Sequence, residues 1–290
     1  GDGGIMGVAI EGSEKAWPGS EGIPLMPDYD VFNKQRHYIE IFNRGQIPFN
    51  YKVSSENSWI IIDDPEGIID ADKRIWISLD WKMVPEGRNT GTLKVSSPRT
   101  DIFITLQAFK PADVSPENIS GFVESEGYVS IESEHFSANL ASDTSRWTRI
   151  EDYGHTLSAM RAEAPANPIP AVPGENSPCL EYKIYLFNTG EFELTSVFSP
   201  TLNFIPGRPL RYAVAFNDDQ PQVVTLVPAA YNAQNRNADW EKSVSDNARF
   251  SVTKHKVSEA GYNTLKIWMV DPGVVIQKII LNTGGLRPSY

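Results

Sequence analysis

The sequence predicts an all-β protein that folds as two β-sandwich domains. Short segments in which apolar and polar residues alternate recur along nearly all of the 290 residues, and Gly, Pro and Asn separate them. Alternation with a period of two is typical of strands that bury one face. The sequence has no long stretch of helical periodicity. Many short strands joined by regular turns favour a sandwich or a jelly roll.

The first domain is predicted from the part of the chain that precedes a proline-containing linker. Its alternating segments are residues 37–45, 74–81, 91–97 and 101–109. The linker, "KPADVSPEN" at residues 110–118, has two prolines and no strand pattern. We therefore place the first domain at residues 1–111 and the second at residues 119–290.

Strand-like alternation resumes in the second domain. The predicted strands are residues 127–134, 178–187, 190–199, 210–217, 222–229, 263–270 and 274–282. Residues 232–249 are the only candidate for a short helix, with Asp239 as its N-cap. Residues 163–178 carry several prolines and are predicted to form a loop.

Composition excludes several classes of protein. A hydrophobic content of 40% and a charged content of 22% are typical of a globular chain. The net charge of −11 argues against a nucleic-acid partner, because binding to phosphates needs a basic face. No segment approaches the length of a membrane span, and the first residues lack the basic and apolar regions of a signal peptide. The single cysteine, Cys179, excludes an internal disulfide and a thiolate zinc cluster.

Glu132 and Glu134 form a pair of carboxylates in the strand-like segment 127–136. If both lie on one strand, their side chains point to the same face. A glycosidase needs two carboxylates that flank the scissile bond, and two parallel side chains cannot do so. We therefore expect a structural role for the pair, either as a solvated or hydrogen-bonded surface or as a metal site.

One segment combines the residue types of a sugar-binding site. Residues 146–153 supply Arg146, Trp147, Arg149, Asp152 and Tyr153, and the stretch is not strand-like. Sugar sites use an aromatic face together with a few polar groups, and arginine pairs well with a uronate carboxylate. We interpret these residues as the candidate carbohydrate-binding site. In the alternative interpretation, Trp147 packs into the core and anchors a long loop over the sandwich.

Several long segments resemble the C-terminal part of the family 115 glycoside hydrolases, which are xylan α-1,2-glucuronidases. They are "MGVAIEGSEKAWPG", "FNKQRHYIEIFNRG", "YVSIESEHFS", "RWTRIEDYGHTLSAM" and "TLKIWMVDPGVVIQKIILNTGGLRPSY". In that family the catalytic centre lies in a barrel domain N-terminal to this region, and no position here matches it. The resemblance therefore implies no catalytic residue in this chain and no enzymatic activity of the chain alone.

Each half of the chain carries a further resemblance. The first half, around "SWIIIDDPEG" and "GTLKVSS", resembles the immunoglobulin-like BACON modules. The second half is similar to jelly-roll carbohydrate-binding modules of the galactose-binding-like type. In those modules the first-strand glutamates, here Glu132 and Glu134, help to hold a structural calcium ion with an aspartate of the last strand. Gln277 stands where that aspartate is expected, which weakens the site. A structural calcium ion and a hydrogen-bonded pair are both left open, and no other cofactor is required.

The resemblance implies a function through a larger enzyme. We expect non-catalytic C-terminal β-domains that support the assembly of a xylan α-1,2-glucuronidase. The alternative is a carbohydrate-binding module that recognises glucuronoxylan or uronate-decorated glycans. The implied partners are the catalytic barrel and a xylan-type polysaccharide or oligosaccharide, and a homodimer stays open. Family resemblance places the protein in the periplasm or outside the cell.

Overall fold

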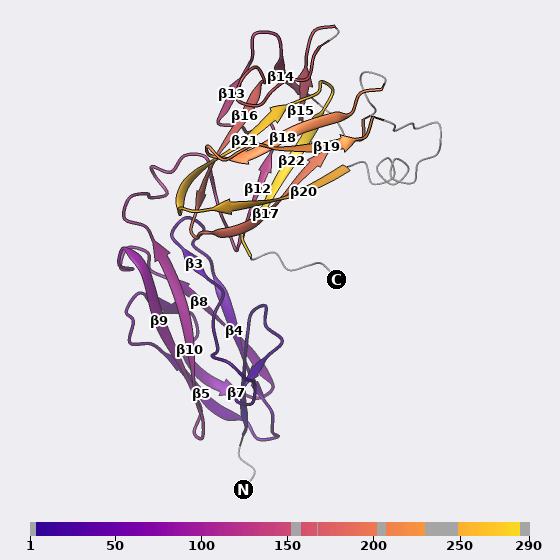
Figure 1. The fold of residues 1–290 in the computed structure, drawn as a ribbon. Helices are drawn as coiled ribbons and strands as arrows, with labels where there is room; N and C mark the ends of the chain where they lie inside the picture. The colour runs from indigo at the N-terminus through magenta and orange to yellow at the C-terminus, as the bar shows by residue number, and fades with distance from the viewer. Residues whose placement is uncertain (1–3, 152–157, 167, 202–206, 230–248, 285–290) are drawn as a thin grey trace. The chain divides into compact units, whose positions relative to one another are not determined.

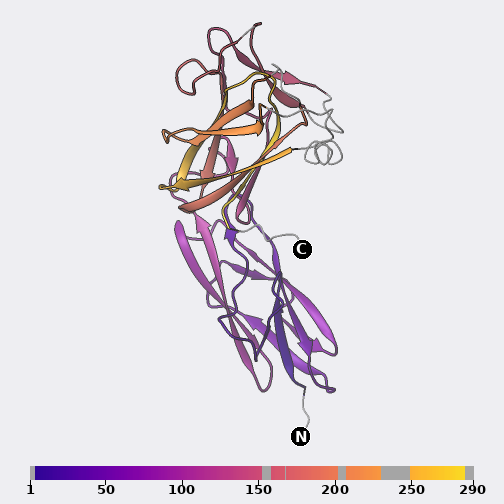
Figure 2. The same cartoon turned by 45° about the vertical axis from the view of Figure 1, so that its right-hand side comes forward.

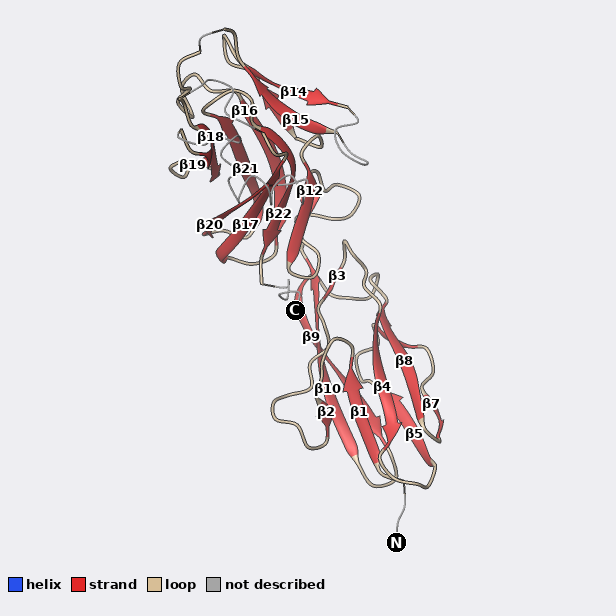
Figure 3. Cartoon of the chain, turned by 90° about the vertical axis from the view of Figure 1, so that its right-hand side faces the viewer, coloured by secondary structure: helices blue, strands red, loops and turns tan. Residues whose placement is uncertain are grey.

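The computed structural model describes residues 4–151, 158–166, 168–201, 207–229 and 249–284. All regular elements in these ranges are β-strands, which confirms the predicted all-β class (Figure 1 and Figure 3). The chain divides into two compact units, Gly1–Ile119 and Ser120–Tyr290. Within the described residues there is no helix that could span a membrane.

The first unit is a sandwich of two five-stranded sheets. The strands of one sheet are, in spatial order, β2 (Ala16–Trp17), β1 (Met6–Ile10), β4 (His37–Asn43), β8 (Asp72–Leu79) and β6 (Ile60–Ile62). Those of the other sheet are β3 (Tyr29–Asp30), β10 (Asp101–Lys110), β9 (Gly87–Ser96), β5 (Phe49–Ser54) and β7 (Glu66–Ile69). Alternation decides which side chains meet between the sheets, because every second residue of a strand points to the same face. Ile39 and Ile41 of β4 belong to the same buried cluster as Ile104 and Leu106 of β10.

The second unit, coloured from magenta to yellow in Figure 2, is also built of strands. It contains two six-stranded sheets. One has the order β11 (Phe122–Val123), β16 (Cys179–Leu186), β21 (Gly261–Met269), β18 (Leu210–Phe216) and β19 (Gln222–Val227), and β13 (Ala138–Leu140) also pairs with β16. The other has the order β14 (Arg146–Ile150), β15 (Ala159–Glu163), β22 (Val275–Asn282), β17 (Gly190–Phe198) and β20 (Arg249–Val257), and β12 (Tyr128–Glu132) also pairs with β22.

A large apolar core lies between these two sheets. Leu180 and Tyr182 of β16 meet Leu194 of β17 and Ile279 of β22 in a single buried cluster. A smaller cluster, formed by Cys179, Ala213, Ala215, Trp268 and Val270, is separate from it. Burial on this scale is the main favourable contribution to folding.

Two sequence-based expectations were wrong in the second unit. Residues 146–150, expected to be part of a loop, form β14 and pair in an antiparallel ladder with β15. The strand that carries Glu132 ends at that residue, so Glu134 lies in the following turn and not on the strand. β20 was missed although its residues alternate strictly between buried and exposed. The candidate helix at 232–249 lies almost entirely outside the described residues.

Candidate functional site

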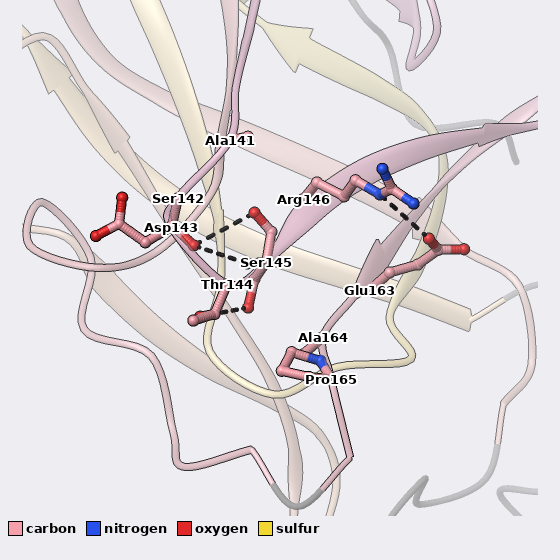
Figure 4. Close-up of a pocket in the computed structure, with 9 residues that line it drawn as sticks. All are labelled: Ala141, Ser142, Asp143, Thr144, Ser145, Arg146, Glu163, Ala164 and Pro165. Carbon is pink, nitrogen blue, oxygen red and sulfur yellow. Dashed lines mark hydrogen bonds and ion pairs between the residues drawn. The ribbon is translucent and has the colours of Figure 1, made fainter.

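A polar pocket of about 440 Å³ opens at the β14–β15 edge of the second unit (Figure 4). It is lined by residues 141–145 of the turn between β13 and β14, by Arg146 at the start of β14, and by residues 163–165 at the end of β15. This volume falls within the range of small-molecule sites. Hydroxyl groups of the turn line part of the pocket, and Ala164 and Pro165 contribute an apolar part.

Hydrogen bonds between side chains and backbone hold the turn in place. The Ser145 amide donates to Ser142 Oγ at 3.0 Å, and the Ser142 amide donates to the Ser145 carbonyl at 2.9 Å. Such local bonds fix a serine-rich turn. The carboxylate of Asp143 lies on the far side of the turn from Arg146 and Glu163 (Figure 4). The pocket is therefore bordered by a well-defined turn.

The β14–β15 ladder brings charged side chains together on one face. Arg146 lies directly opposite Glu163, and Thr148 lies opposite Arg161. Arg161 Nη2 donates to Glu163 Oε1 at 2.5 Å, and Thr148 Oγ1 donates to Glu163 Oε2 at 2.9 Å. The hydrogen bond from Arg161 is the main cause that lowers the pKa of Glu163 below its usual value. Glu163 is thus an ionised carboxylate with a partner on each oxygen.

Arg146 is held only loosely by this cluster. Its Nε lies 3.7 Å from Glu163 Oε2, beyond hydrogen-bond range, and its side chain is 72% exposed. Among the described residues, none accepts a hydrogen bond from its guanidinium. The pocket therefore has an accessible cation at its rim, next to a carboxylate whose two oxygens already accept hydrogen bonds from other residues.

The three described members of the predicted sugar-binding set, Arg146, Trp147 and Arg149, do not share one exposed face. Trp147 is 2% exposed, belongs to the core cluster, and donates from Nε1 to the Pro178 carbonyl at 3.0 Å. It therefore cannot offer a ring face to a sugar, and the structure favours the core alternative. Arg149 lies on the face opposite to Arg146. Asp152 and Tyr153 lie outside the described residues.

The predicted glutamate pair has cationic neighbours. Arg149 Nη2 lies 2.7 Å from Glu134 Oε2, and the Ser158 hydroxyl donates to the same oxygen. Glu132 lies directly opposite Lys278 in the β12–β22 ladder. Opposite charges at such positions stabilise a sheet.

These residues do not fit a calcium ion. A cation bound to Glu134 would have to displace the Arg149 guanidinium, and Gln277 is turned to Ser199, to whose Oγ its Nε2 donates at 2.9 Å. Calcium sites need several oxygen ligands. In the described part of the chain, no group of three or more His, Cys, Asp or Glu side chains could hold a metal.

A buried ionic cluster was missed by sequence reasoning. Asp271, 2% exposed, accepts hydrogen bonds from Arg208 Nε at 2.6 Å and Arg211 Nε at 2.7 Å. Arg208 also donates to the Pro168 carbonyl and so ties the proline-rich segment to the sandwich. The only sequence signal is the Asp-Pro-Gly turn, because the arginines lie about 60 positions away. The ion pairs of Asp271 with Arg208 and Arg211 therefore join distant parts of the second unit.

Residues 121–290 match the family described as the glycosyl hydrolase family 115 C-terminal domain. The chain belongs to this family. The match covers the described part of the second unit and confirms the resemblance predicted from the sequence. No curated protein is similar to the chain at a significant level.

The comparison with solved structures finds matches to parts of the chain. A family GH115 4-O-methyl-α-glucuronidase with specificity for decorated arabinogalactans is 15% identical, with a TM-score of 0.41 over 60% of this chain and 19% of that chain. A family 6 carbohydrate-binding module of a Zobellia galactanivorans laminarinase is 13% identical, with a TM-score of 0.33 over 53% of this chain and 98% of that chain. A family 35 module from Clostridium thermocellum is 12% identical, with a TM-score of 0.34 over 53% and 97%. The family assignment rests on the match over residues 121–290.

Proposed function

We propose that the chain is a non-catalytic part of a family 115 glycoside hydrolase and that it supports assembly of the enzyme with its catalytic domain. The observation that supports this most is the use of the carboxylates in the described second unit. Asp271 is shared by Arg208 and Arg211, and Glu134 is paired with Arg149. A glycosidase needs two carboxyl groups that flank the scissile bond, one protonated to act as the acid and the other ionised. Carboxylates held by guanidinium groups suit a structural role.

Expression of the parent catalytic domain with and without this chain tests the assembly role. We expect the catalytic domain to gain solubility and a higher melting temperature when the chain is present, because burial of a domain interface stabilises the folded state. The pure chain should release no 4-O-methylglucuronic acid from xylan. Equal solubility and melting temperature in both preparations would refute the assembly role. In this proposal the enzyme acts in the periplasm or outside the cell, where polysaccharides are found.

A second candidate function is glycan binding by the pocket at the β14–β15 edge. The observation that favours it is the accessible guanidinium of Arg146 beside hydroxyl-bearing Ser142 and Thr144. Such pockets combine a few polar groups with an apolar wall. The ligands in this proposal are glucuronoxylan or other uronate-decorated glycans.

Affinity electrophoresis in gels that contain glucuronoxylan tests the second candidate. We expect the chain to be retarded and the Arg146→Gln variant to migrate as in a gel without polysaccharide. Lys256→Gln is the matched control, because Lys256 is an exposed cation on β20 and belongs to a different part of the unit. Retardation that Arg146→Gln leaves unchanged would exclude the pocket. This outcome would not affect the assembly role.

A further inference from the structure

The arrangement of charges around the pocket points to a specific ligand group. Arg146 and Glu163 are cross-strand neighbours of opposite charge, yet their closest atoms are 3.7 Å apart. A strong charge-assisted hydrogen bond between such groups spans about 2.7–2.9 Å. The two side chains are therefore close enough to interact electrostatically but do not form the bidentate pair that arginine and carboxylate can make.

Other partners explain why Glu163 does not close onto Arg146. Arg161 holds Glu163 Oε1 through Nη2 at 2.5 Å and Nε at 3.2 Å, and Thr148 holds Oε2 at 2.9 Å. Arg161 and Glu163 are two positions apart on β15, so their side chains lie on the same face. Arg161 and Thr148 thus act as positioning residues: they hold the carboxylate 3.7 Å from Arg146, near enough to attract the guanidinium but too far to form a hydrogen bond with it.

The neighbouring surface suits a sugar more than a bare inorganic anion. Ser142 and Thr144 bring hydroxyl groups to one part of the pocket, and Ala164 and Pro165 form an apolar part. A pyranose ring presents hydroxyl groups at its edge and C–H groups on its faces, so it can satisfy both. An inorganic anion would leave the apolar part without a partner.

We propose that the pocket recognises the carboxylate of an acidic sugar through Arg146, with Glu163 as an internal competitor for the same guanidinium. This inference rests on the proposed glycan-binding function and adds to it the ligand group and the residue that limits affinity. Guanidinium and carboxylate match in a planar, two-point geometry that lysine cannot reproduce. A neutral sugar of the same size would leave the guanidinium without a carboxylate.

If Glu163 competes for Arg146, removal of its carboxylate should raise the affinity for acidic sugars. A carboxylate that contacts sugar hydroxyl groups would be needed for binding, and its loss would weaken every ligand. A carboxylate that competes for Arg146 would weaken acidic ligands only. The Glu163→Gln variant should therefore bind acidic sugars more tightly and neutral sugars unchanged, because the amide removes a negative charge near the incoming carboxylate.

Calorimetric titration of the full chain with two matched probes tests this inference. The probes are xylotriose that carries one 4-O-methylglucuronic acid and unsubstituted xylotriose. We expect the acidic probe to bind at least about tenfold more tightly, a difference of about 1.4 kcal/mol. Arg146→Gln should abolish this preference, Glu163→Gln should increase affinity for the acidic probe severalfold, and Lys256→Gln should change neither. Melting curves of each variant verify that the second unit remains folded.

Each contrary result has a distinct meaning. Equal affinity for both probes would overturn the proposal that the pocket recognises the sugar carboxylate, and the glycan-binding function would still stand. Weaker binding of both probes by folded Glu163→Gln would show that Glu163 contacts sugar and does not compete. Binding of neither probe would exclude both the inference and the glycan-binding function, while the assembly role would stand. If the Arg146→Gln variant still prefers the acidic probe, a residue other than Arg146 binds the sugar carboxylate and the proposal is wrong.

Discussion

The buried cluster around Asp271 allows a quantitative prediction for Asp271→Ala. The carboxylate is 2% exposed and accepts hydrogen bonds from Arg208 Nε, Arg211 Nε and, at 3.3 Å, Arg211 Nη2. Its removal takes away the carboxylate that the guanidinium groups of Arg208 and Arg211 share and leaves two like charges near each other. Deleting one partner of a buried ion pair costs about 3–5 kcal/mol because the remaining charge is uncompensated.

The exposure of the arginines places the expected cost at the lower end of that range. The Arg211 side chain is 28% exposed and can turn toward solvent, whereas the Arg208 side chain is 15% exposed and also holds the Pro168 carbonyl. We therefore expect Asp271→Ala to lower the free energy of unfolding of the second unit by about 3 kcal/mol. For a domain of this size, that corresponds to a melting temperature roughly 6–12 °C lower.

Urea denaturation of the full chain, followed by Trp fluorescence, measures this cost. Glu191→Ala is the control, because Glu191 and Lys254 are paired at 4.0 Å and each side chain is 68% exposed. Exposed pairs contribute little, so the control should remain within about 0.5 kcal/mol of the unsubstituted chain. A cost below about 1 kcal/mol for Asp271→Ala would refute the argument from an uncompensated buried charge.

Three further predictions test other parts of the second unit. Trp147→Ala should lower the free energy of unfolding by about 3–5 kcal/mol in the same urea assay, because the ring is packed in the core. A loss below about 1 kcal/mol would contradict the assignment of Trp147 to the core. Chelation or added calcium should leave the melting temperature unchanged, since Arg149 occupies Glu134; a calcium-dependent rise would contradict this. Burial raises the pKa of the Cys179 thiol to about 12, so a thiol reagent at pH 8 should modify it only after unfolding, and rapid reaction with native protein would disagree.

Strands with clear alternation could be predicted from sequence because their pattern is local. Residues 101–109 were predicted as a strand, and β10 spans Asp101–Lys110 with alternating burial. β14 was missed because "RWTRI" contains only one large apolar residue on its buried face, Trp147, and charged residues on both faces. Pairing with β15 makes it a strand, and that pairing joins residues that are 9–17 positions apart. Tertiary context therefore decided what the local pattern left undetermined.

The candidate site was only partly predictable for the same reason. Arg146 was singled out from its residue type, but Glu163 was assigned to a proline-rich loop, although β15 ends at that residue. The spacing of Arg161 and Glu163 was a usable signal, since opposite charges two positions apart lie on one face of a strand. Nothing in the sequence states that Arg146 lies opposite Glu163, because the strand register follows from the turn and the core.

Assembly and glycan binding can serve the same enzyme, and the pocket's chemistry suggests how. A single guanidinium at a solvent-exposed rim gives weak affinity, because water screens the charge and competes for its N–H groups. Weak affinity is sufficient when the site is linked to a catalytic domain, since a tether turns the second encounter into an intramolecular one at millimolar effective concentration. A tight site would instead hold the polysaccharide and slow its release. The competing Glu163 carboxylate, held by Arg161 and Thr148, would keep the affinity of Arg146 for an acidic sugar within that weak range.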